Sequence, residues 1–163
     1  EIFPLIEPDA SDSMALDSVV EALVHAGRPM PAAQCMVVPE SWSHRPHMSQ
    51  AHRDLFAYCN CVIEPWDGPA ALAVSDGRWV IASMDRNGLR PLRYTVTTDG
   101  LLVVGSESGM VPIDEAQVIE KGRLGPGEMI GVQLEEGRFY HDRELKDMLA
   151  ARHPYVLARV EAV

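Results

Sequence analysis

The sequence predicts an α+β domain in which a layer of helices packs against antiparallel sheets. The first sixty residues place apolar side chains at helical spacing, and from residue 71 the pattern changes to short extended runs separated by turn signals. Helices followed by a series of strands favour this class over alternating β-α-β units, which build parallel sheets. The 163 residues contain no internal repeat, so one domain is expected.

The clearest predicted helix spans residues 11–27. Its apolar residues recur every three or four positions and form one stripe: Leu16, Val19, Val20, Leu23 and Val24. Ser11, Asp12 and Ser13 offer N-caps, because their side-chain oxygens accept hydrogen bonds from free backbone N–H groups. Gly27 tolerates the left-handed conformation that ends many helices. We therefore expect this helix to lay its stripe on a core.

Two shorter helices are predicted next. One runs from Pro31 to Val38, where a proline early in the helix costs no hydrogen bond and Pro39 closes the segment. The other runs from about Ser49 to Cys61. All three helices precede the extended part of the chain.

Short strands dominate the rest of the chain. Four are predicted at residues 71–74, 78–83, 93–97 and 101–106. Asp76-Gly77 and Asp99-Gly100 are hairpin turn signals, so these four strands are expected to form an antiparallel meander. Two of them, 71–74 and 101–106, are apolar at nearly every position, which predicts burial on both faces between a second sheet and a helix layer.

The C-terminal part adds one more hairpin and a helix. Strands are predicted at residues 128–134 and 138–142, on either side of Glu136-Gly137. A short helix is expected at 144–151, followed by a tail to Val163.

Composition and charge exclude several classes of protein. The 14 Lys and Arg against 24 Asp and Glu give a net charge of −10, which repels phosphate backbones and acidic lipid surfaces, so neither nucleic acid nor a membrane is expected as a partner. No apolar run reaches the roughly 18 to 20 residues of a membrane span. Three cysteines without a framework spacing fit a reducing compartment, which predicts a cytoplasmic location.

The cysteines and histidines do not predict a metal site. The candidates are Cys35, Cys59, Cys61, His44, His47 and His52. A lone C-x-C lacks the second pair of ligands that a tetrahedral site requires. We expect the cysteines to be small core residues, with no basic neighbour to activate a thiol, and the histidines to belong to a solvated loop.

Two turn-rich stretches are further candidates for a site. In residues 85–91, Asn87-Gly88 allows a tight turn and Pro91 extends the residue before it, so Arg86 and Arg90 project from a rigid bend; a plain hairpin turn with two surface arginines is the simpler interpretation. Residues 122–127 are glycine-rich but lack the Gly-Lys-Ser/Thr ending of a phosphate loop, which favours a structural loop.

Asp12 is the remaining candidate, with two interpretations. A carboxylate at a helix start can cap that helix and stabilise it by about 1 kcal/mol. It can instead face a pocket and pair with an ammonium group of a substrate, leaving the flanking serines to cap. The residue types alone favour the cap.

Several runs together resemble the type 2 glutamine amidotransferase domain of the glutamate synthase family. They are ASDS (10–13), VPESW (38–42), EPWDGPAAL (64–72), DRNGLRPLRY (85–94), GSESGM (105–110) and EKGRLGPGEMIGV (120–132). The likeness extends from Glu1 to about Ala150, and it assigns residues 1–150 to the C-terminal portion of that domain and 151–163 to a tail or linker.

The resemblance implies an N-terminal-nucleophile hydrolase fold, an αββα sandwich in which an N-terminal cysteine attacks the side-chain amide of L-glutamine. It also implies that Asp12, in the Ser-Asp-Ser sequence, binds the substrate ammonium group. A carboxylate opposite a desolvated ammonium forms a charge-assisted contact that distinguishes amino acids from simple amides. The only site residue that the resemblance assigns here is therefore Asp12, with no catalytic residue and no metal ligand.

The departures from the family pattern limit the expected activity. Residue 1 is Glu1, without the nucleophilic cysteine or an initiator methionine, and the family's substrate-carboxylate arginine and oxyanion Asn-Gly precede the Ser-Asp-Ser motif. We do not transfer the oxyanion role to Asn87-Gly88. The sequence therefore predicts a piece of a longer protein that alone lacks glutaminase activity.

For the longer protein, the resemblance implies that ammonia from glutamine passes to a site where 2-oxoglutarate is reductively aminated to glutamate. The family uses FMN and an iron–sulfur cluster, none of it expected in these residues, and some members use a small electron-supplying subunit. Two alternatives stay open: another type 2 amidotransferase, such as a phosphoribosyl-pyrophosphate amidotransferase, and a non-catalytic interaction module.

Overall fold

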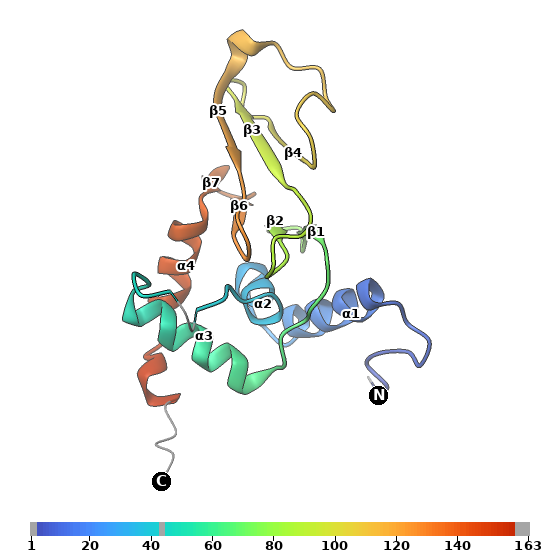
Figure 1. Ribbon diagram of the computed structural model, residues 1–163, viewed down its shortest axis with the longest axis vertical. Coiled ribbons are helices and arrows are strands. Elements are labelled where there is room, and N and C mark those ends of the chain that lie inside the picture. Colours follow the sequence, from blue (N-terminus) through green and yellow to red (C-terminus); the bar gives the residue numbers. More distant parts are fainter. Residues whose placement is uncertain (1–2, 43–44, 159–163) are drawn as a thin grey trace.

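The computed structural model describes residues 3–42 and 45–158. The helices in these ranges are α1 (Asp12–His25), α2 (Met30–Val37), α3 (Gln50–Val62), α4 (Asp142–Ala150) and the short 3-10 helices η1 (Glu115–Gln117) and η2 (Tyr155–Ala158). The strands are β1 (Ala71–Ser75), β2 (Trp79–Met84), β3 (Arg93–Thr97), β4 (Leu102–Gly105), β5 (Val118–Arg123), β6 (Met129–Gln133) and β7 (Arg138–Tyr140). Figure 1 shows their arrangement along the chain.

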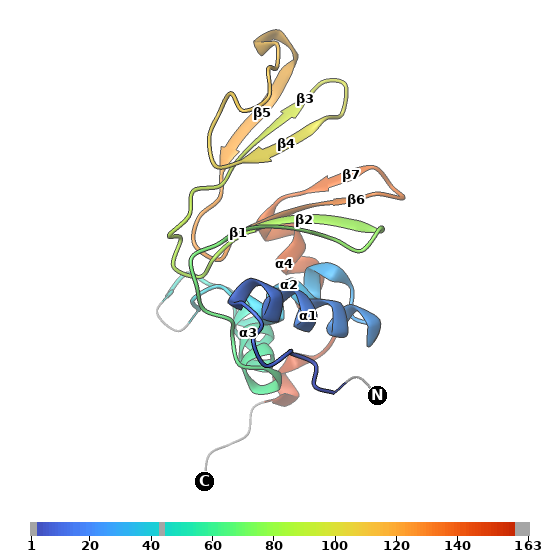
Figure 2. The same ribbon diagram turned by 90° about the vertical axis from the view of Figure 1, so that its right-hand side faces the viewer.

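The strands form two antiparallel sheets. One has four strands in the order β1-β2-β6-β7, and the other has three in the order β4-β3-β5. Figure 2 shows the helices on one face of the four-stranded sheet and the three-stranded sheet beyond its other face. The predicted α+β class with antiparallel sheets and more than one layer is confirmed.

The two Asp-Gly hairpins are confirmed, but the single meander is wrong. Val74 pairs with Ile81 in one sheet, and Val96 pairs with Leu102 in the other. The chain changes sheets at residues 85–91, so the two hairpins never share an edge. A turn signal reports only the residues beside it, and it says nothing about which sheet receives the next strand.

The prediction also missed β5, which pairs with β3. Its half-buried positions are Val118, Glu120 and Gly122, and its exposed positions include Ile119. Only one of the three inward residues is apolar, so the alternation of polar and apolar residues that marks a strand is absent.

The expected burial of residues 71–74 and 101–106 on both faces is wrong as well. β1 alternates between exposed and half-buried positions, and β4 is half-buried throughout. Both strands lie at a sheet edge. The strands buried on both faces are the central ones, β2 and β6, because these alone have a strand on each side as well as a layer above and below.

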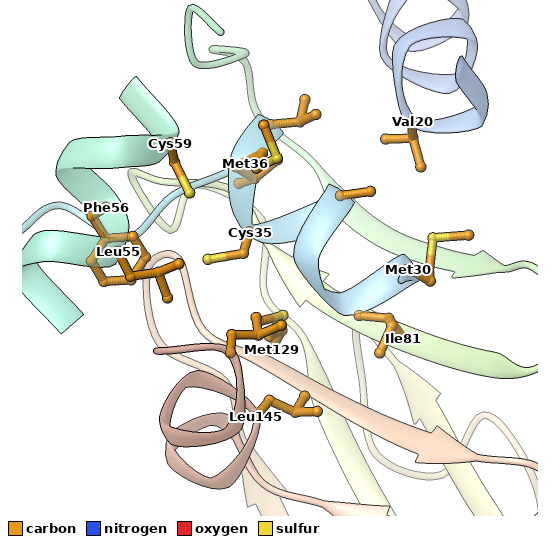
Figure 3. Close-up of a cluster of buried hydrophobic side chains, with 14 of the residues drawn as sticks. Val20, Met30, Cys35, Met36, Leu55, Phe56, Cys59, Ile81, Met129 and Leu145 are labelled. Carbon is orange, nitrogen blue, oxygen red and sulfur yellow. The ribbon is translucent and has the colours of Figure 1, made fainter. Parts of the chain in front are cut away.

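Two clusters of apolar side chains hold the layers together. The larger one fills the space between the helices and the four-stranded sheet (Figure 3), and its labelled members are Val20, Met30, Cys35, Met36, Leu55, Phe56, Cys59, Ile81, Met129 and Leu145. The smaller one lies between the sheets and consists of Ala82, Met84, Leu92, Leu124 and Ile130. Leu16 and Val20 bury the stripe of α1, as its periodicity predicts. In the described ranges, no helix has the length and apolar character needed to cross a bilayer.

Candidate functional site

Asp12 is the first residue of α1, and it does not cap the helix. The cap is Ser11, whose Oγ accepts a hydrogen bond from the backbone N–H of Met14 at 3.3 Å. The Oγ atoms of Ser11 and Ser13 lie 3.2 Å apart. Asp12 is exposed, and its carboxylate makes no hydrogen bond or ion pair with any residue that the structure describes. Of the two interpretations of Asp12, the structure therefore removes the one in which it serves as the cap.

Residues 64–70 run past the start of α1 and hold its backbone. The indole N–H of Trp66 donates to the carbonyl oxygen of Asp12 at 3.1 Å. The backbone N–H of Trp66 donates to the carbonyl of Val37 at the end of α2, at 2.8 Å. One residue thus ties the first turn of α1 to the last turn of α2, although all three lie far apart in the sequence.

The turn at residues 85–91 is organised by the buried carboxylate of Asp85. Backbone N–H groups of four residues donate to its two oxygens: Ala70, Asn87, Leu89 and Arg90. Burial opposes ionisation, but these four donors hold the pKa of Asp85 below its ordinary value. Gly88 adopts φ +67° and lies against Pro126, where a Cβ would come within 2.7 Å. The turn is a structural element, but it is not the plain hairpin turn with two surface arginines: it carries the chain from β2 in one sheet to β3 in the other, and Arg86 is half-buried while Arg90 is exposed.

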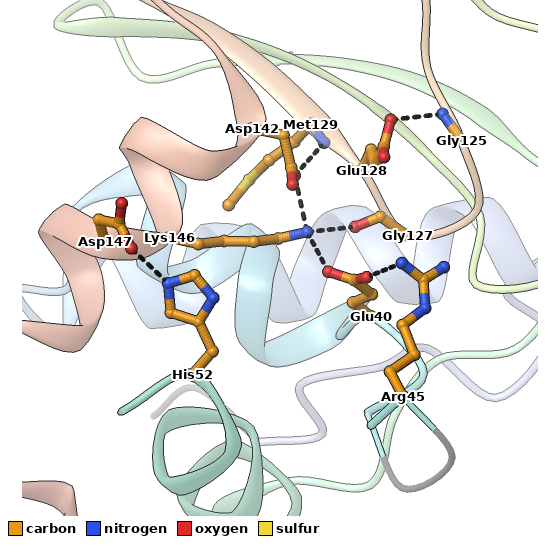
Figure 4. A network of polar contacts seen from close by, with 10 residues as sticks. All are labelled: Glu40, Arg45, His52, Gly125, Gly127, Glu128, Met129, Asp142, Lys146 and Asp147. Carbon is orange, nitrogen blue, oxygen red and sulfur yellow. Dashed lines mark hydrogen bonds and ion pairs between the residues drawn. The ribbon is translucent and has the colours of Figure 1, made fainter. Parts of the chain in front are cut away.

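A second polar cluster, which sequence reasoning missed, lies between α4 and the segment before α3 (Figure 4). Lys146 is 2% exposed, and its Nζ lies 2.6 Å from Glu40 Oε2, 2.6 Å from Asp142 Oδ1 and 3.2 Å from the carbonyl of Gly127. Arg45 makes a further ion pair with Glu40. We call Glu40, Lys146 and Asp142 the buried ion cluster.

The charges of this cluster stabilise one another. Burial alone would lower the pKa of Lys146, but the carboxylates of Asp142 and Glu40 overcome it and raise that pKa. Burial raises the pKa of Asp142, against the opposing effect of Lys146. All three protons of the Lys146 ammonium group have acceptors, so this group has no free donor for a ligand. The buried ion cluster is therefore structural.

Of residues 122–127, Gly122 and Arg123 end β5, and residues 124–127 form a loop that closes over the buried ion cluster. Gly127 lies against Glu40, where a Cβ would come within 2.7 Å of its Cα, and the N–H of Gly125 donates to Glu128 at 2.7 Å. A cavity of about 470 Å³ opens beside the buried ion cluster and is lined in part by Arg45, His47 and His52. The loop is structural, as its sequence indicates.

The predicted roles of the cysteines and histidines hold only in part. Cys35 and Cys59 are buried core residues, but Cys61 is exposed, because it falls on the outer face of α3. A hydrogen bond to Cys59 and burial raise the pKa of Cys35. The prediction that His52 lies in a solvated loop is wrong. His52 lies on α3, and its Nε2 is 2.7 Å from Asp147 Oδ1.

His47 is exposed in a turn as predicted, and His44 lies outside the described residues. Over residues 3–42 and 45–158, no three His, Cys, Asp or Glu side chains gather as metal ligands would. The three cysteines lie on α2 and on two faces of α3, so they do not converge on one centre.

Comparison with known proteins places this fold and these motifs in a family. The family model described as glutamine amidotransferases class-II matches residues 1–157, and the chain belongs to that family. Within it, the chain is similar to the "Glutamate synthase [NADPH] large chain" of Azospirillum brasilense, at 58% identity over 155 residues that cover 95% of this chain and 10% of the relative.

Two other relatives extend the same similarity. The "Glutamate synthase [NADPH] large chain" of Bacillus subtilis is 42% identical over 155 residues, and the "Ferredoxin-dependent glutamate synthase 2, chloroplastic" of Arabidopsis thaliana is 44% identical over 158. Each match covers 95% of this chain and 10% of the relative. The chain thus spans about a tenth of the length of these curated relatives.

Proposed function

We propose that these residues form part of the glutaminase domain of a glutamate synthase, which hydrolyses L-glutamine to glutamate and ammonia. The class-II amidotransferase match over residues 1–157 supports the glutaminase reaction. The names of the three relatives support glutamate synthase over a phosphoribosyl-pyrophosphate amidotransferase.

In this proposal Asp12 binds the α-ammonium group of L-glutamine. One observation supports this role. Ser11 caps α1, and the Asp12 carboxylate has no partner among the described residues. An ammonium opposite a carboxylate forms a charge-assisted hydrogen bond, roughly twice as strong as a neutral one. An amide substrate without the α-amino group would leave this carboxylate unpaired, which is the basis of selectivity for an amino acid.

The ammonia would then serve the reductive amination of 2-oxoglutarate to glutamate in another part of the protein. FMN and an iron–sulfur cluster would supply the redox chemistry there. The residues described here do not fit an iron–sulfur cluster, because two cysteines face each other inside the core and the third is exposed on α3. We assign no step of that chemistry to this segment, nor any contact with a small electron-supplying subunit.

We also propose that the whole domain is an αββα sandwich, of which this chain forms the C-terminal portion. Helices, four-stranded sheet and three-stranded sheet would be three layers of an αββα sandwich, with the outer helices supplied by other residues of the longer protein. Residues 1–150 would be the C-terminal portion of the amidotransferase domain, and 151–163 a tail or linker. A cytoplasmic location fits the free cysteines.

The test is the substitution Asp12→Asn in the full-length protein, assayed as glutamine hydrolysis. Loss of the charge should raise KM for glutamine by about 100-fold, since a charged hydrogen bond and its ion pair are both weakened. Asp17→Asn is the matched control, because Asp17 is exposed on the same helix and should leave KM unchanged. An unaltered KM in Asp12→Asn would overturn the proposed role of Asp12, whereas a full-length protein that hydrolyses no glutamine would favour a non-catalytic interaction module.

A further inference from the structure

Trp66 holds the backbone at Asp12 without occupying its carboxylate. The indole N–H donates to the Asp12 carbonyl oxygen at 3.1 Å. A carbonyl in the first turn of a helix also accepts the regular helical hydrogen bond, so the indole uses its second lone pair. The side chain of Asp12 remains available to a ligand while its backbone is fixed.

The Trp66 ring is itself fixed on several sides. Its backbone N–H donates to Val37 at 2.8 Å, and the ring packs against the larger apolar cluster. Gly68 lies directly against the indole, where a Cβ would come within 2.7 Å of Cη2. The position of the indole N–H is therefore set by the core of the molecule.

The same segment is anchored at its other end to the turn at residues 85–91. Asn87 Nδ2 donates to Asp67 Oδ1 at 3.1 Å. Ala70 and Asp85 exchange two hydrogen bonds, one to the backbone carbonyl of Ala70 at 3.0 Å and one to Asp85 Oδ1 at 3.3 Å. Residues 64–70 thus join α1, α2 and the turn in one frame (Figure 2).

We propose that Trp66 is a positioning residue for substrate selection, which holds Asp12 at the distance where its carboxylate meets the α-ammonium group of glutamine. This inference rests on the proposed function of Asp12. The first turn of a helix frays easily, and the strength of a charge-assisted contact depends on its geometry. A donor fixed by the core removes that freedom before the substrate arrives, so less ordering is required on binding.

The experiment compares two substrates in the full-length protein: L-glutamine and glutaramate, which has the same amide and carboxylate but no α-amino group. The measured quantity is the ratio of their kcat/KM values. Trp66→Phe retains an aromatic ring and removes the indole N–H, and the ratio should fall about 3- to 10-fold, mainly through KM for glutamine. Both substrates are assayed on one sample, so the folded fraction cancels. Gly68→Ala, which displaces the indole, should change the ratio in the same direction.

Two further variants separate the possible outcomes. Trp79→Phe is the matched control: Trp79 packs in the same cluster, its indole N–H has no acceptor among the described residues, and its ratio should equal that of the unmodified protein. Asp12→Asn reports on the proposed function. If it lowers the ratio and Trp66→Phe does not, the inference about Trp66 is overturned and the role of Asp12 stands. If neither variant changes the ratio, the roles of Asp12 and Trp66 are both overturned. If Trp66→Phe lowers kcat/KM equally for the two substrates, Trp66 has only a structural role and the inference is overturned.

Discussion

Lys146 is a buried charge, 2% exposed, and two carboxylates lie 2.6 Å from its ammonium group. Lys146→Met keeps most of the side-chain volume and removes the charge, which leaves Asp142 without an ion-pair partner among the described residues and Glu40 with Arg45 alone. Breaking a buried ion pair in this way costs about 3–5 kcal/mol. We expect urea denaturation of the 163-residue chain, followed by tryptophan fluorescence, to show a loss of that size.

The control for this prediction is a pair on the surface. Lys121 lies 2.6 Å from Glu115 in an equally short contact, but 47% and 80% of the two side chains are exposed. Lys121→Met should therefore change the free energy of unfolding by less than about 1 kcal/mol. A similar loss in both variants would contradict the importance of burial.

Asp85 supports a second prediction at the same scale. Asp85→Ala leaves four backbone N–H groups without their acceptor inside a turn, at a cost of about 2–4 kcal/mol in the same denaturation experiment.

Asp85 also predicts a dependence of stability on pH. Since folding lowers the pKa of Asp85, its contribution to the free energy of unfolding is present above pH 3.8 and is lost as the pH falls through the lower, folded value. Asp17→Ala, on the exposed face of α1, should stay within about 0.5 kcal/mol, and an acid transition identical in both variants would contradict the assignment.

The sequence identified some of these residues and missed others. The Ser-Asp-Ser neighbours point to Asp12, whose role stays a prediction, and Asn87-Gly88 indicates the rigid turn. Lys146 gave no signal, because a lysine in a helix is usually exposed and its partner Glu40 lies 106 positions away. Contacts between residues so distant in the chain depend on the fold, which no local pattern encodes.

At the scale of elements, a polar latch joins the three-stranded sheet to α4. Glu120 on β5 lies 2.6 Å from the hydroxyl of Tyr94 on β3 and 2.7 Å from His141 Nε2 at the start of α4. His141 also contacts Glu144, which pairs with Arg138 on β7. The latch thus connects both sheets and a helix through side chains alone.

The latch predicts a pH dependence of stability near neutrality. Hydrogen bonding to Glu120 and Glu144 raises the pKa of His141 despite partial burial. A raised histidine pKa means that the stabilisation is full below the ordinary value of 6.5 and is lost as the pH rises through the folded value. We expect the melting temperature to fall over this range and His141→Gln to abolish that part of the fall.

His25→Gln is the control for this experiment, because His25 lies on the exposed face of α1, where its Nε2 is 3.7 Å from Glu21 Oε1. It should leave the pH profile unchanged. The phenol of Tyr94 does not contribute, since burial and Glu120 raise its pKa to about 12. A profile that is the same with and without His141 would contradict the latch.

The elements themselves were largely predictable, and their partners were not. α1 and α3 follow the caps Ser11 and Ser49 and their apolar spacing. β5 was missed, because Glu120 and Gly122 occupy its inward positions. Both residues serve the latch: Glu120 accepts from Tyr94, and Gly122 makes room for the Tyr94 ring, which a Cβ would approach to 2.3 Å. A strand shaped by such contacts loses the apolar alternation by which a strand is found.

At the scale of the whole molecule, the layers leave the three-stranded sheet covered on one side only. The smaller apolar cluster fills its inner face, while Ile119 on β5 is 63% exposed. Arg93 and Arg123 pair directly across β3 and β5. Like charges directly opposite one another on two strands are unfavourable, so this arginine pair does not stabilise the pairing of β3 with β5.

The placement of the three cysteines predicts that a polypeptide of these 163 residues hydrolyses no glutamine. Cys35 and Cys59 are enclosed in the core, and Cys61 lies on α3 without a base or oxyanion donor beside it in the described ranges. Under the proposed function, Asp12 would still supply one contact to the substrate, but the chain would have no nucleophile. The measurement is ammonia release from glutamine, with the full-length protein as the positive control. Release that a thiol-alkylating reagent abolishes would contradict the prediction and would place a reactive cysteine within these residues.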